Sequence, residues 1–166
     1  MRLFKKYDDK KLEMLHIARE LVLAIALAVV IFGFLIGISL VSGPSMHPTL
    51  KDRQPVVYSR ISRDFNVGDV VSVRMPNGEY YVKRIVAMAG DTVEVKDGAL
   101  YVNGERETRE TVHGVTEPQE GEVVYPLTVP LGQVFVLGDN REVSIDSRTY
   151  GPVATSQIRG KLFFVK

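Results

Sequence analysis

Two residues of this chain could together carry out acyl transfer, Ser45 and Lys83. Ser45 lies in residues 42–50, Ser-Gly-Pro-Ser-Met-His-Pro-Thr-Leu, whose glycine and prolines break a helix and leave the serine in a stiff, irregular segment. A serine hydroxyl is a weak nucleophile until a neighbouring base accepts its proton. Because a serine in such a turn is more often a plain turn residue, the prediction depends on finding that base.

The best candidate for the base is Lys83, on a predicted strand at residues 79–88. Alternation along the strand does not decide between Lys83 and Arg84, since each shares a face with apolar side chains. Chemistry does decide, because arginine stays protonated in proteins. A lysine among apolar side chains has a lowered pKa and can accept a proton. The alternative is a lysine whose stem lies on the sheet while its amine reaches water.

Histidine is a weaker candidate for the base. His47 follows Ser45 by two residues and is tethered by Pro48, so it can hardly reach the hydroxyl and also be oriented by a carboxylate. The chain has three histidines and no cysteine, and the histidines show no metal-ligand spacing. We therefore expect no metal and no organic cofactor.

A third polar stretch, residues 138–151, follows a predicted apolar strand. Loops of this composition usually bond to their own backbone. Here Ser144 could also orient an amine, while Asp146 and Arg148 pair and stiffen the loop. Asp139 and Asp146 could instead suggest acid–base or metal chemistry. That alternative is weaker, because no third ligand is in pattern and an arginine follows each carboxylate by two residues.

The elements that must position these residues begin with an apolar run at residues 21–41, which contains no charged residue. As a helix it would be about 30 Å long, enough for a transmembrane helix, and it is too long for the core of a removable signal peptide. More Lys and Arg precede the run than follow it closely. That bias predicts a cytoplasmic segment at 1–20 and an extracytoplasmic domain at 42–166 in a single-pass plasma-membrane protein. Ser45 would then lie close to the bilayer surface.

The domain after this helix is predicted to be mainly β, built of packed antiparallel sheets or a partly open barrel. Segments rich in Val, Ile, Tyr or Phe predict strands at 55–59, 69–75, 79–88, 91–96, 99–102, 133–137 and 162–165. Pro-Asn-Gly at 76–78 and Asp-Gly at 97–98 each predict a hairpin. Weak apolar patterning at 105–126 predicts a solvated loop or mobile hairpin, and no helix is predicted after Val41.

In this order behind one anchor, the three stretches resemble bacterial type I signal peptidases. Residues 42–50 resemble the nucleophile box of that family, and Gly-Asp-Val-Val at 68–71 resembles the next box. Residues 81–86, followed by Gly-Asp at 90–91, resemble the general-base box, and residues 138–148 the last. The resemblance implies a β-rich catalytic domain that removes signal peptides from exported preproteins with small residues before the cut.

Site residues follow from the resemblance one by one. It implies Ser45 as nucleophile and Lys83 as general base, with a positioning hydroxyl and a supporting ion pair from Ser144, Asp146 and Arg148. It also implies a substrate-binding or oxyanion region at Gly43, Pro44 and Met46. Many Gram-negative relatives have an oxyanion-binding serine where this chain has Gly43, so the second oxyanion donor stays open. The single anchor resembles the compact Gram-positive type, and mitochondrial inner-membrane peptidases share the boxes.

The expected partners are signal-peptide-bearing preproteins and membrane lipid. Nucleic acid is not expected, because the formal net charge is only +1. Two other hypotheses remain open. A related Ser-Lys processing protease with another substrate, such as a self-cleaving repressor type, would need a DNA-binding module ahead of Ser45. A non-catalytic, membrane-tethered β-domain of an export complex would make Ser45 and Lys83 dispensable.

Overall fold

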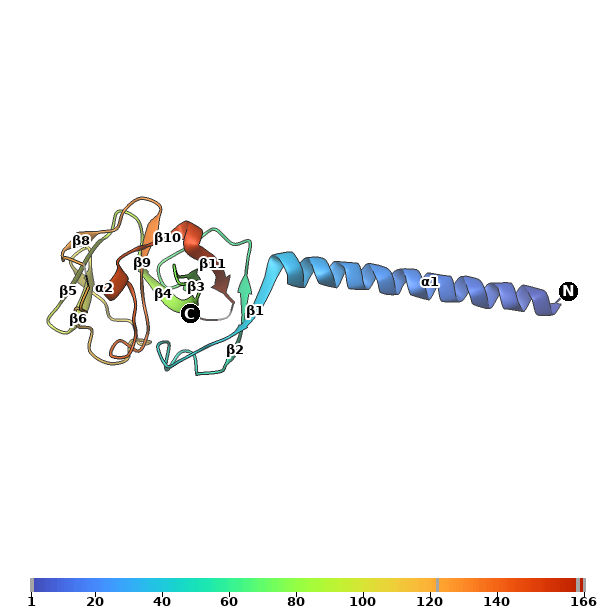
Figure 1. Cartoon of the computed structure of the whole chain (residues 1–166), viewed down its shortest axis with the longest axis horizontal. Helices are drawn as coiled ribbons and strands as arrows, with labels where there is room; N and C mark the ends of the chain where they lie inside the picture. Colours follow the sequence, from blue (N-terminus) through green and yellow to red (C-terminus); the bar gives the residue numbers. More distant parts are fainter. Residues whose placement is uncertain (1, 122, 164, 166) are drawn as a thin grey trace.

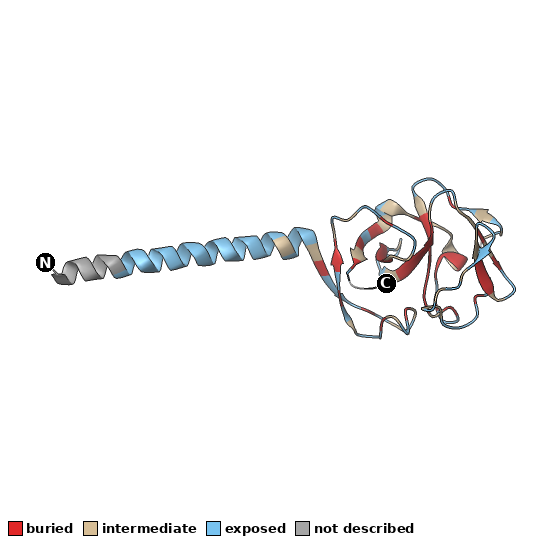
Figure 2. Ribbon diagram, turned by 180° about the vertical axis from the view of Figure 1, so that it is seen from behind, coloured by how far each residue is buried: buried red, intermediate tan, exposed pale blue. Residues whose placement is uncertain are grey.

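The computed structural model describes residues 2–121, 123–163 and 165, with side chains from residue 10 onward. Figure 1 shows a long N-terminal helix that leads into a β-domain. The helix α1 (Arg2–Val30) continues into one π-helical turn, η1 (Ile31–Leu35). Within it, the 26-residue segment Lys10–Leu35 contains an 18-residue window with a mean hydropathy of 2.3 and no buried residue, so it is long and apolar enough to cross a membrane. Figure 2 shows the exposed surface along α1.

The expected helix at 21–41 is wrong at its C-terminal end. The helical segment ends at Leu35, and the next residues form the strand β1 (Ile36–Leu40), which pairs antiparallel with β2 (Pro55–Ser59). The ring of Tyr58 on β2 packs directly over Gly37, where a Cβ would collide with it. Because an apolar run alone does not distinguish a helix from a strand, only this pairing fixes the boundary. The β-domain therefore begins at Ile36 instead of residue 42.

Two antiparallel sheets form the β-domain, which confirms the mainly β prediction. The larger sheet has the strand order β1-β2-β11-β3-β4-β9-β10, and its remaining strands are β3 (Val70–Arg74), β4 (Tyr80–Ala87), β9 (Gln133–Leu137), β10 (Val153–Ala154) and β11 (Ile158–Leu162). The smaller sheet has the order β7-β6-β5-β8, with β5 (Thr92–Lys96), β6 (Ala99–Val102), β7 (Glu105–Arg106) and β8 (Leu127–Thr128). The two predicted hairpins are present as β3–β4 and β5–β6.

Two features near the C-terminus differ from the sequence-based expectation. The last strand covers Ile158–Leu162 instead of 162–165. Gly160 interrupts the apolar pattern of this strand in the sequence. The structure requires glycine there, because a Cβ would collide with the backbone carbonyl of Ser59. A short helix, α2 (Ser147–Tyr150), and a 3-10 turn, η2 (Thr155–Gln157), were not expected. Both are too short to leave a helical period in the sequence.

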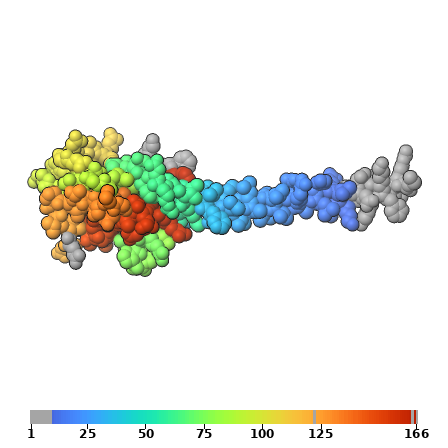
Figure 3. Space-filling model, turned by 90° about the horizontal axis from the view of Figure 1, so that it is seen from above, coloured from blue at the N-terminus to red at the C-terminus, as the bar shows by residue number. Residues whose placement is uncertain are grey.

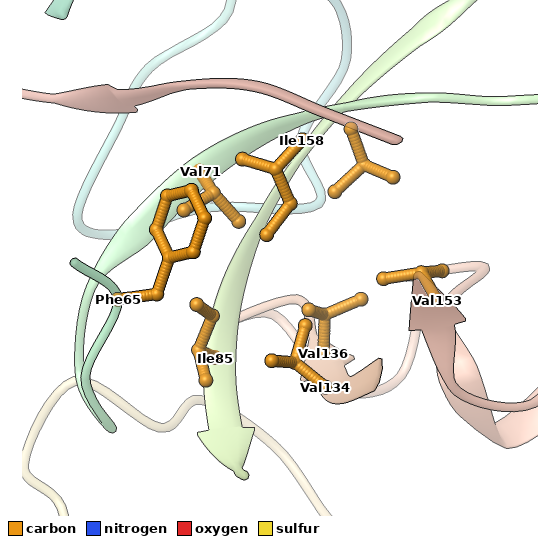
Figure 4. Close-up of a cluster of buried hydrophobic side chains, with 8 residues drawn as sticks. Phe65, Val71, Ile85, Val134, Val136, Val153 and Ile158 are labelled. Carbon is orange, nitrogen blue, oxygen red and sulfur yellow. The ribbon is translucent and has the colours of Figure 1, made fainter. Parts of the chain in front are cut away.

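The core fixes strand β4, which carries Lys83. One buried cluster, drawn in Figure 4, contains Ile85 of β4 with seven partners, Phe65, Val71, Val73, Val134, Val136, Val153 and Ile158. A second cluster contains Val86 of β4, packed with residues of β9 and of the smaller sheet. Strands β4 and β9 therefore bury both of their faces, and burial on two sides makes them the most rigid place in the fold to mount a side chain.

Candidate active site

Ser45 is held in a loop whose neighbouring side chains are buried. Met46 and Leu50 are fully buried in a third apolar cluster, and the amide of Leu50 donates to the carbonyl of Met46 over 2.8 Å. Gly43 has φ +86°, a left-handed conformation that favours glycine, and its amide donates to Asp52 Oδ1 over 2.8 Å. Met46, predicted in the substrate region, instead anchors the loop, because its side chain points into the core.

Lys83 projects from β4 directly to this serine. Its Nζ donates a hydrogen bond of 2.9 Å to Ser45 Oγ, and only 3% of the residue is exposed. The alternative of an amine that reaches water is therefore wrong. Burial lowers the pKa of Lys83 to about 8, partly opposed by the carboxylate of Asp146, which raises it, while Arg148 lowers it further. About a tenth of this lysine is thus neutral at pH 7.

The predicted ion pair of the C-terminal loop is present and fully buried. Arg148 donates from Nε to Asp146 Oδ1 over 2.8 Å and from Nη2 to Oδ2 over 2.9 Å. Asp146 also caps α2 by accepting from the amide of Arg148, and accepts from the amide of Gly138. Further bonds from Arg148 Nη2 reach the carbonyls of Arg141 and Ser144. The pair therefore holds the loop against the end of β9.

Ser144 is buried in this loop, and its Oγ has no hydrogen-bond partner among the residues that the structure describes. The expected bond from this hydroxyl to the lysine amine is therefore not formed in the structure. A buried hydroxyl without a partner is costly, by about 1 to 3 kcal/mol. Beside it lies Gly138, where a Cβ would collide both with Ser144 and with the carbonyl of Ser45. The glycine thus allows the Ser144 loop and the Ser45 loop to approach each other.

A second buried ion pair, which the sequence analysis did not identify, supports the other side of the site. Arg84 donates to Asp139 from Nε over 2.8 Å and from Nη2 over 2.7 Å, and Thr49 Oγ1 donates to the same carboxylate. The next residue, Asn140, donates from its amide to the carbonyl of Ser45 over 3.0 Å. The signal in the sequence was a second cation, Arg84, beside Lys83 on a predicted strand, together with Asp139 after another predicted strand. Only the pairing of β4 with β9 brings these residues together.

The two carboxylates considered for acid–base or metal chemistry do not form one site. Asp139 is neutralised by Arg84 and Asp146 by Arg148. Among the described residues, no group of three or more His, Cys, Asp or Glu is placed to hold a metal ion. His47 makes no hydrogen bond with Ser45 in the described part of the chain. Its ring instead lies edge-on to His113, with centroids 5.9 Å apart.

The described residues of 105–126 are mostly exposed and irregular after the short strand β7, as the loop prediction has it, but parts of the segment pack against the C-terminal loop. Thr116 is buried and accepts from Arg141 Nη1 over 2.7 Å, and the same guanidinium pairs with Glu107. Gln119 Nε2 donates to the carbonyl of Ser144 over 2.7 Å. One glutamate of this segment, Glu107, therefore pairs with an arginine of the C-terminal loop. Residue 122 lies outside the described residues.

A cavity of about 190 Å³ opens beside the Ser45–Lys83 pair. Its walls come from the end of β1 and the following residues, from β3, from β4 and from the C-terminal loop, namely Ser39, Leu40, Val41, Ser42, Ser72, Tyr80, Tyr81, Val82, Val143 and Ile145. Leu40, Val143 and Ile145 are more than half exposed, so the rim of the cavity is apolar. A small cavity with an apolar rim beside an edge strand suits an extended peptide with small side chains.

Comparison with known proteins points the same way. Residues 14–166 match the family model described as signal peptidase, peptidase S26. Signal peptidase I of Bacillus amyloliquefaciens is 37% identical over 99% of this chain and 94% of that protein, and signal peptidase I S of Bacillus subtilis is 37% identical over 95% and 91%. A crystal structure of a signal peptidase I from Enterococcus faecalis superposes with a TM-score of 0.53 at 32% identity, covering 60% of this chain and 97% of that chain.

Proposed function

Since this chain belongs to the signal peptidase family, peptidase S26, we propose that it cuts preproteins with Ser45 as nucleophile and Lys83 as general base. Signal peptidase I is a serine peptidase that removes signal peptides from preproteins, and this chain is such an enzyme. The observation that carries the proposed dyad is the 2.9 Å contact between Lys83 Nζ and Ser45 Oγ in a buried site. The relatives, named as peptidases, also argue against a non-catalytic tethered domain.

The reaction begins with neutral Lys83 accepting the proton of Ser45 as Oγ attacks the scissile carbonyl. The lysinium then protonates the leaving amine, and an acyl-serine remains. Lys83, neutral again, accepts a proton from the hydrolytic water as its oxygen attacks the acyl carbon, and returns that proton to Ser45 Oγ when the acyl–oxygen bond breaks and the product leaves. The lowered pKa of Lys83, about 8, supports this role, because it lies close to working pH.

The oxyanion of the tetrahedral intermediate is stabilised by backbone donors. Gly43 has no side chain that could contribute a hydroxyl. The amide of Ser45 is the natural first donor, since it donates to none of the residues that the structure describes. Pro44 contributes rigidity to this donor, because its carbonyl accepts from the amide of His47 and from Asn140 Nδ2.

The C-terminal loop positions the lysine. Asp146 raises the pKa of Lys83 and its partner Arg148 lowers it, so the pair affects the charge of the amine as well as the shape of the loop. The buried Oγ of Ser144, which has no partner in the described part of the chain, is available to accept from the amine when Lys83 is protonated. We assign Ser144, Asp146 and Arg148 as positioning residues on these grounds.

The site acts at a membrane. The helical segment Lys10–Leu35 is the proposed single span, with the N-terminus in the cytoplasm and the β-domain outside the plasma membrane. Preproteins reach the same surface through their own apolar segments, and confinement of both partners raises their encounter frequency. The exposed apolar rim of Leu40, Val143 and Ile145 would then contact lipid beside the cleavage site.

The test uses full-length protein purified in detergent and incubated with a preprotein, beside a Ser45→Ala variant. The expected result is release of one signal peptide, with mass spectrometry locating the cut after a small residue, and no release by the variant. Cutting by the variant, or cutting at unrelated sites, would exclude this assignment and favour a processing protease with another substrate.

A further inference from the structure

A second cavity, of about 400 Å³, lies where the apolar helix joins the β-domain. Its walls come from Gly33 and Phe34 in the last helical turn, from residues 156–159, and from Arg60, Arg63 and Arg74. We name it the junction pocket. It lies apart from the Ser45–Lys83 cavity, with which it shares no lining residue. Figure 3 shows the helix projecting from the β-domain with no other described segment packed along it.

The junction pocket is strongly cationic. Its lining includes four arginines, Arg60, Arg63, Arg74 and Arg159, and no Asp or Glu. None of the four forms an ion pair with a carboxylate of the described residues, whereas the arginines of the catalytic region are paired, Arg84 with Asp139 and Arg148 with Asp146. A convergent set of guanidinium groups without protein anions is a site for an external anion, and guanidinium forks fit phosphate oxygens.

The arginines of this pocket are held in place without being neutralised. Arg60 Nη1 donates to the carbonyl of Gly33 over 2.8 Å, while its Nε is buried without a partner among the described residues. Arg63 Nη1 donates to the carbonyl of Ile158 over 3.4 Å. The guanidinium of Arg159 lies 5.5 Å from the ring centre of Tyr80. These bonds orient the side chains and leave most of their donors open.

The position of the pocket identifies the source of the anion. Gly33 and Phe34 lie within the last turn of the apolar segment Lys10–Leu35. If that segment spans a bilayer, its end lies at the depth of the lipid headgroups. Phe34 is 69% exposed on the helix surface, where an acyl chain would pack. A phospholipid lying along the helix would therefore present its phosphate to the arginines.

We propose that the junction pocket binds the phosphate of an anionic phospholipid, such as phosphatidylglycerol, at the outer end of the membrane span. This bound lipid would fix the position of the β-domain relative to the bilayer, which is a function separate from peptide cleavage. Arginines near an anionic surface each strengthen lipid binding about fivefold. The inference depends on the proposed span and is independent of the Ser45–Lys83 chemistry.

The chain contains no tryptophan, so Phe34→Trp places a single fluorescent reporter on the wall of the pocket. The full-length variant is put into two kinds of phosphatidylcholine nanodisc. One contains a low mole fraction of phosphatidylglycerol with brominated chains, and the other contains the same mole fraction of phosphatidylcholine with brominated chains. Bromine quenches tryptophan only on contact. We expect stronger quenching by the brominated phosphatidylglycerol, and equal quenching by the two lipids would overturn the proposal.

The matched variants are Arg63→Gln/Arg159→Gln in the pocket and Lys96→Gln/Arg106→Gln on the smaller sheet, all four residues exposed. Each double variant removes two positive charges. The pocket variant should lose at least about tenfold in preference for phosphatidylglycerol, and the other variant little. An equal loss in both would show general charge attraction and overturn the proposal. Displacement of the lipid by millimolar inorganic phosphate at constant ionic strength would equally overturn it, in favour of a free-anion site.

Two controls separate this inference from the proposed function. Both double variants should cut a preprotein in detergent at the unaltered rate, which also shows that they are folded. Ser45→Ala in the Phe34→Trp background should keep the lipid preference. If the protein prefers the anionic lipid but does not cut the preprotein, the lipid proposal stands and the dyad is refuted. If it cuts the preprotein but shows no lipid preference, the dyad stands and the lipid proposal is refuted.

Discussion

The Nζ of Lys83 and the Oγ of Ser45 are 2.9 Å apart, although 38 positions separate the two residues in the chain. Each is fixed by a different part of the core. The lysine stands on β4, which packs on both faces. The serine is held by buried side chains of the third cluster, Val41 before it in the chain and Met46 and Leu50 after it. Their separation is therefore set by packing and stays constant without substrate.

Ser45→Ala and Lys83→Ala should each lower kcat/KM for preprotein cleavage by at least about a thousandfold, because neither group works without the other. The double variant should be hardly worse than either single variant. Lys83→Arg should also be inactive, since a guanidinium does not give up its proton. Steady-state cleavage of one preprotein measures all four. Full activity of Lys83→Ala with loss in His47→Ala would restore the histidine base.

Cleavage should rise with pH. Lys83 must be neutral to accept the serine proton, and burial lowers its pKa to about 8. About a tenth of the lysine is then neutral at pH 7 and about nine tenths at pH 9, so kcat/KM should increase about tenfold across that interval and level off above it. A pH profile in detergent checks this. An acid optimum would contradict the lysine base and point to the carboxylates of Asp139 and Asp146.

Removing the lysine should stabilise the fold. Burial penalises the protonated amine, and this penalty is fully present below about pH 8 and disappears as pH rises toward the ordinary value of 10.5. Lys83→Met keeps an unbranched chain and should raise the free energy of unfolding by about 1 to 3 kcal/mol at pH 7. The gain should shrink by pH 10.

Urea unfolding of the full chain in micelles, followed by near-UV circular dichroism, measures this gain at the two pH values. The exposed Lys51→Met is the matched control and should change stability little. A pH-independent gain in Lys83→Met would show that packing, and not the buried charge, is responsible.

Gly138→Ala should inactivate the enzyme. A Cβ at this position would collide with the side chain of Ser144 and with the carbonyl of Ser45, which is backbone and cannot rotate away. We expect a loss of at least about a hundredfold in kcat with a destabilisation of about 1 to 3 kcal/mol. Gly33→Ala is the control, because nothing lies within 4 Å of its added Cβ. Unaltered kcat in Gly138→Ala would show that the two loops can separate without cost.

Bulky residues just before the cut should block processing. The cavity beside Ser45 and Lys83 has a volume of only about 190 Å³, and it must hold the neighbouring residues of the substrate as well as the residue before the cut, so a large ring there would clash. Preproteins with Ala or Phe at that position, compared by mass spectrometry at equal concentration, should differ by at least about a hundredfold in rate. Equal cleavage would mean that the residue before the cut binds elsewhere.

Local patterns predicted much of the fold. The segments rich in Val, Ile, Tyr or Phe that form β2, β4 and β9 and the Asp-Gly turn of β5–β6 are where the sequence placed them, because strand propensity and turn conformation depend on residue types and their neighbours along the chain. The strand β1 was missed for the opposite reason. Its apolar residues continue those of the helix, and only pairing with β2 makes it a strand. The packing of residues 105–126 was missed likewise, since its partner Arg141 is distant in sequence.

For the site, too, some features follow from the sequence and others only from the tertiary structure. The residue types by themselves determined that Ser45 could be a nucleophile and that Lys83, not Arg84, could be its base, because those properties belong to the side chains. The tertiary structure decided what residue types cannot, namely that the amine lies at hydrogen-bond distance and that its pKa is lowered. Desolvation depends on which atoms surround the amine, and those atoms come from segments that meet only when the chain folds.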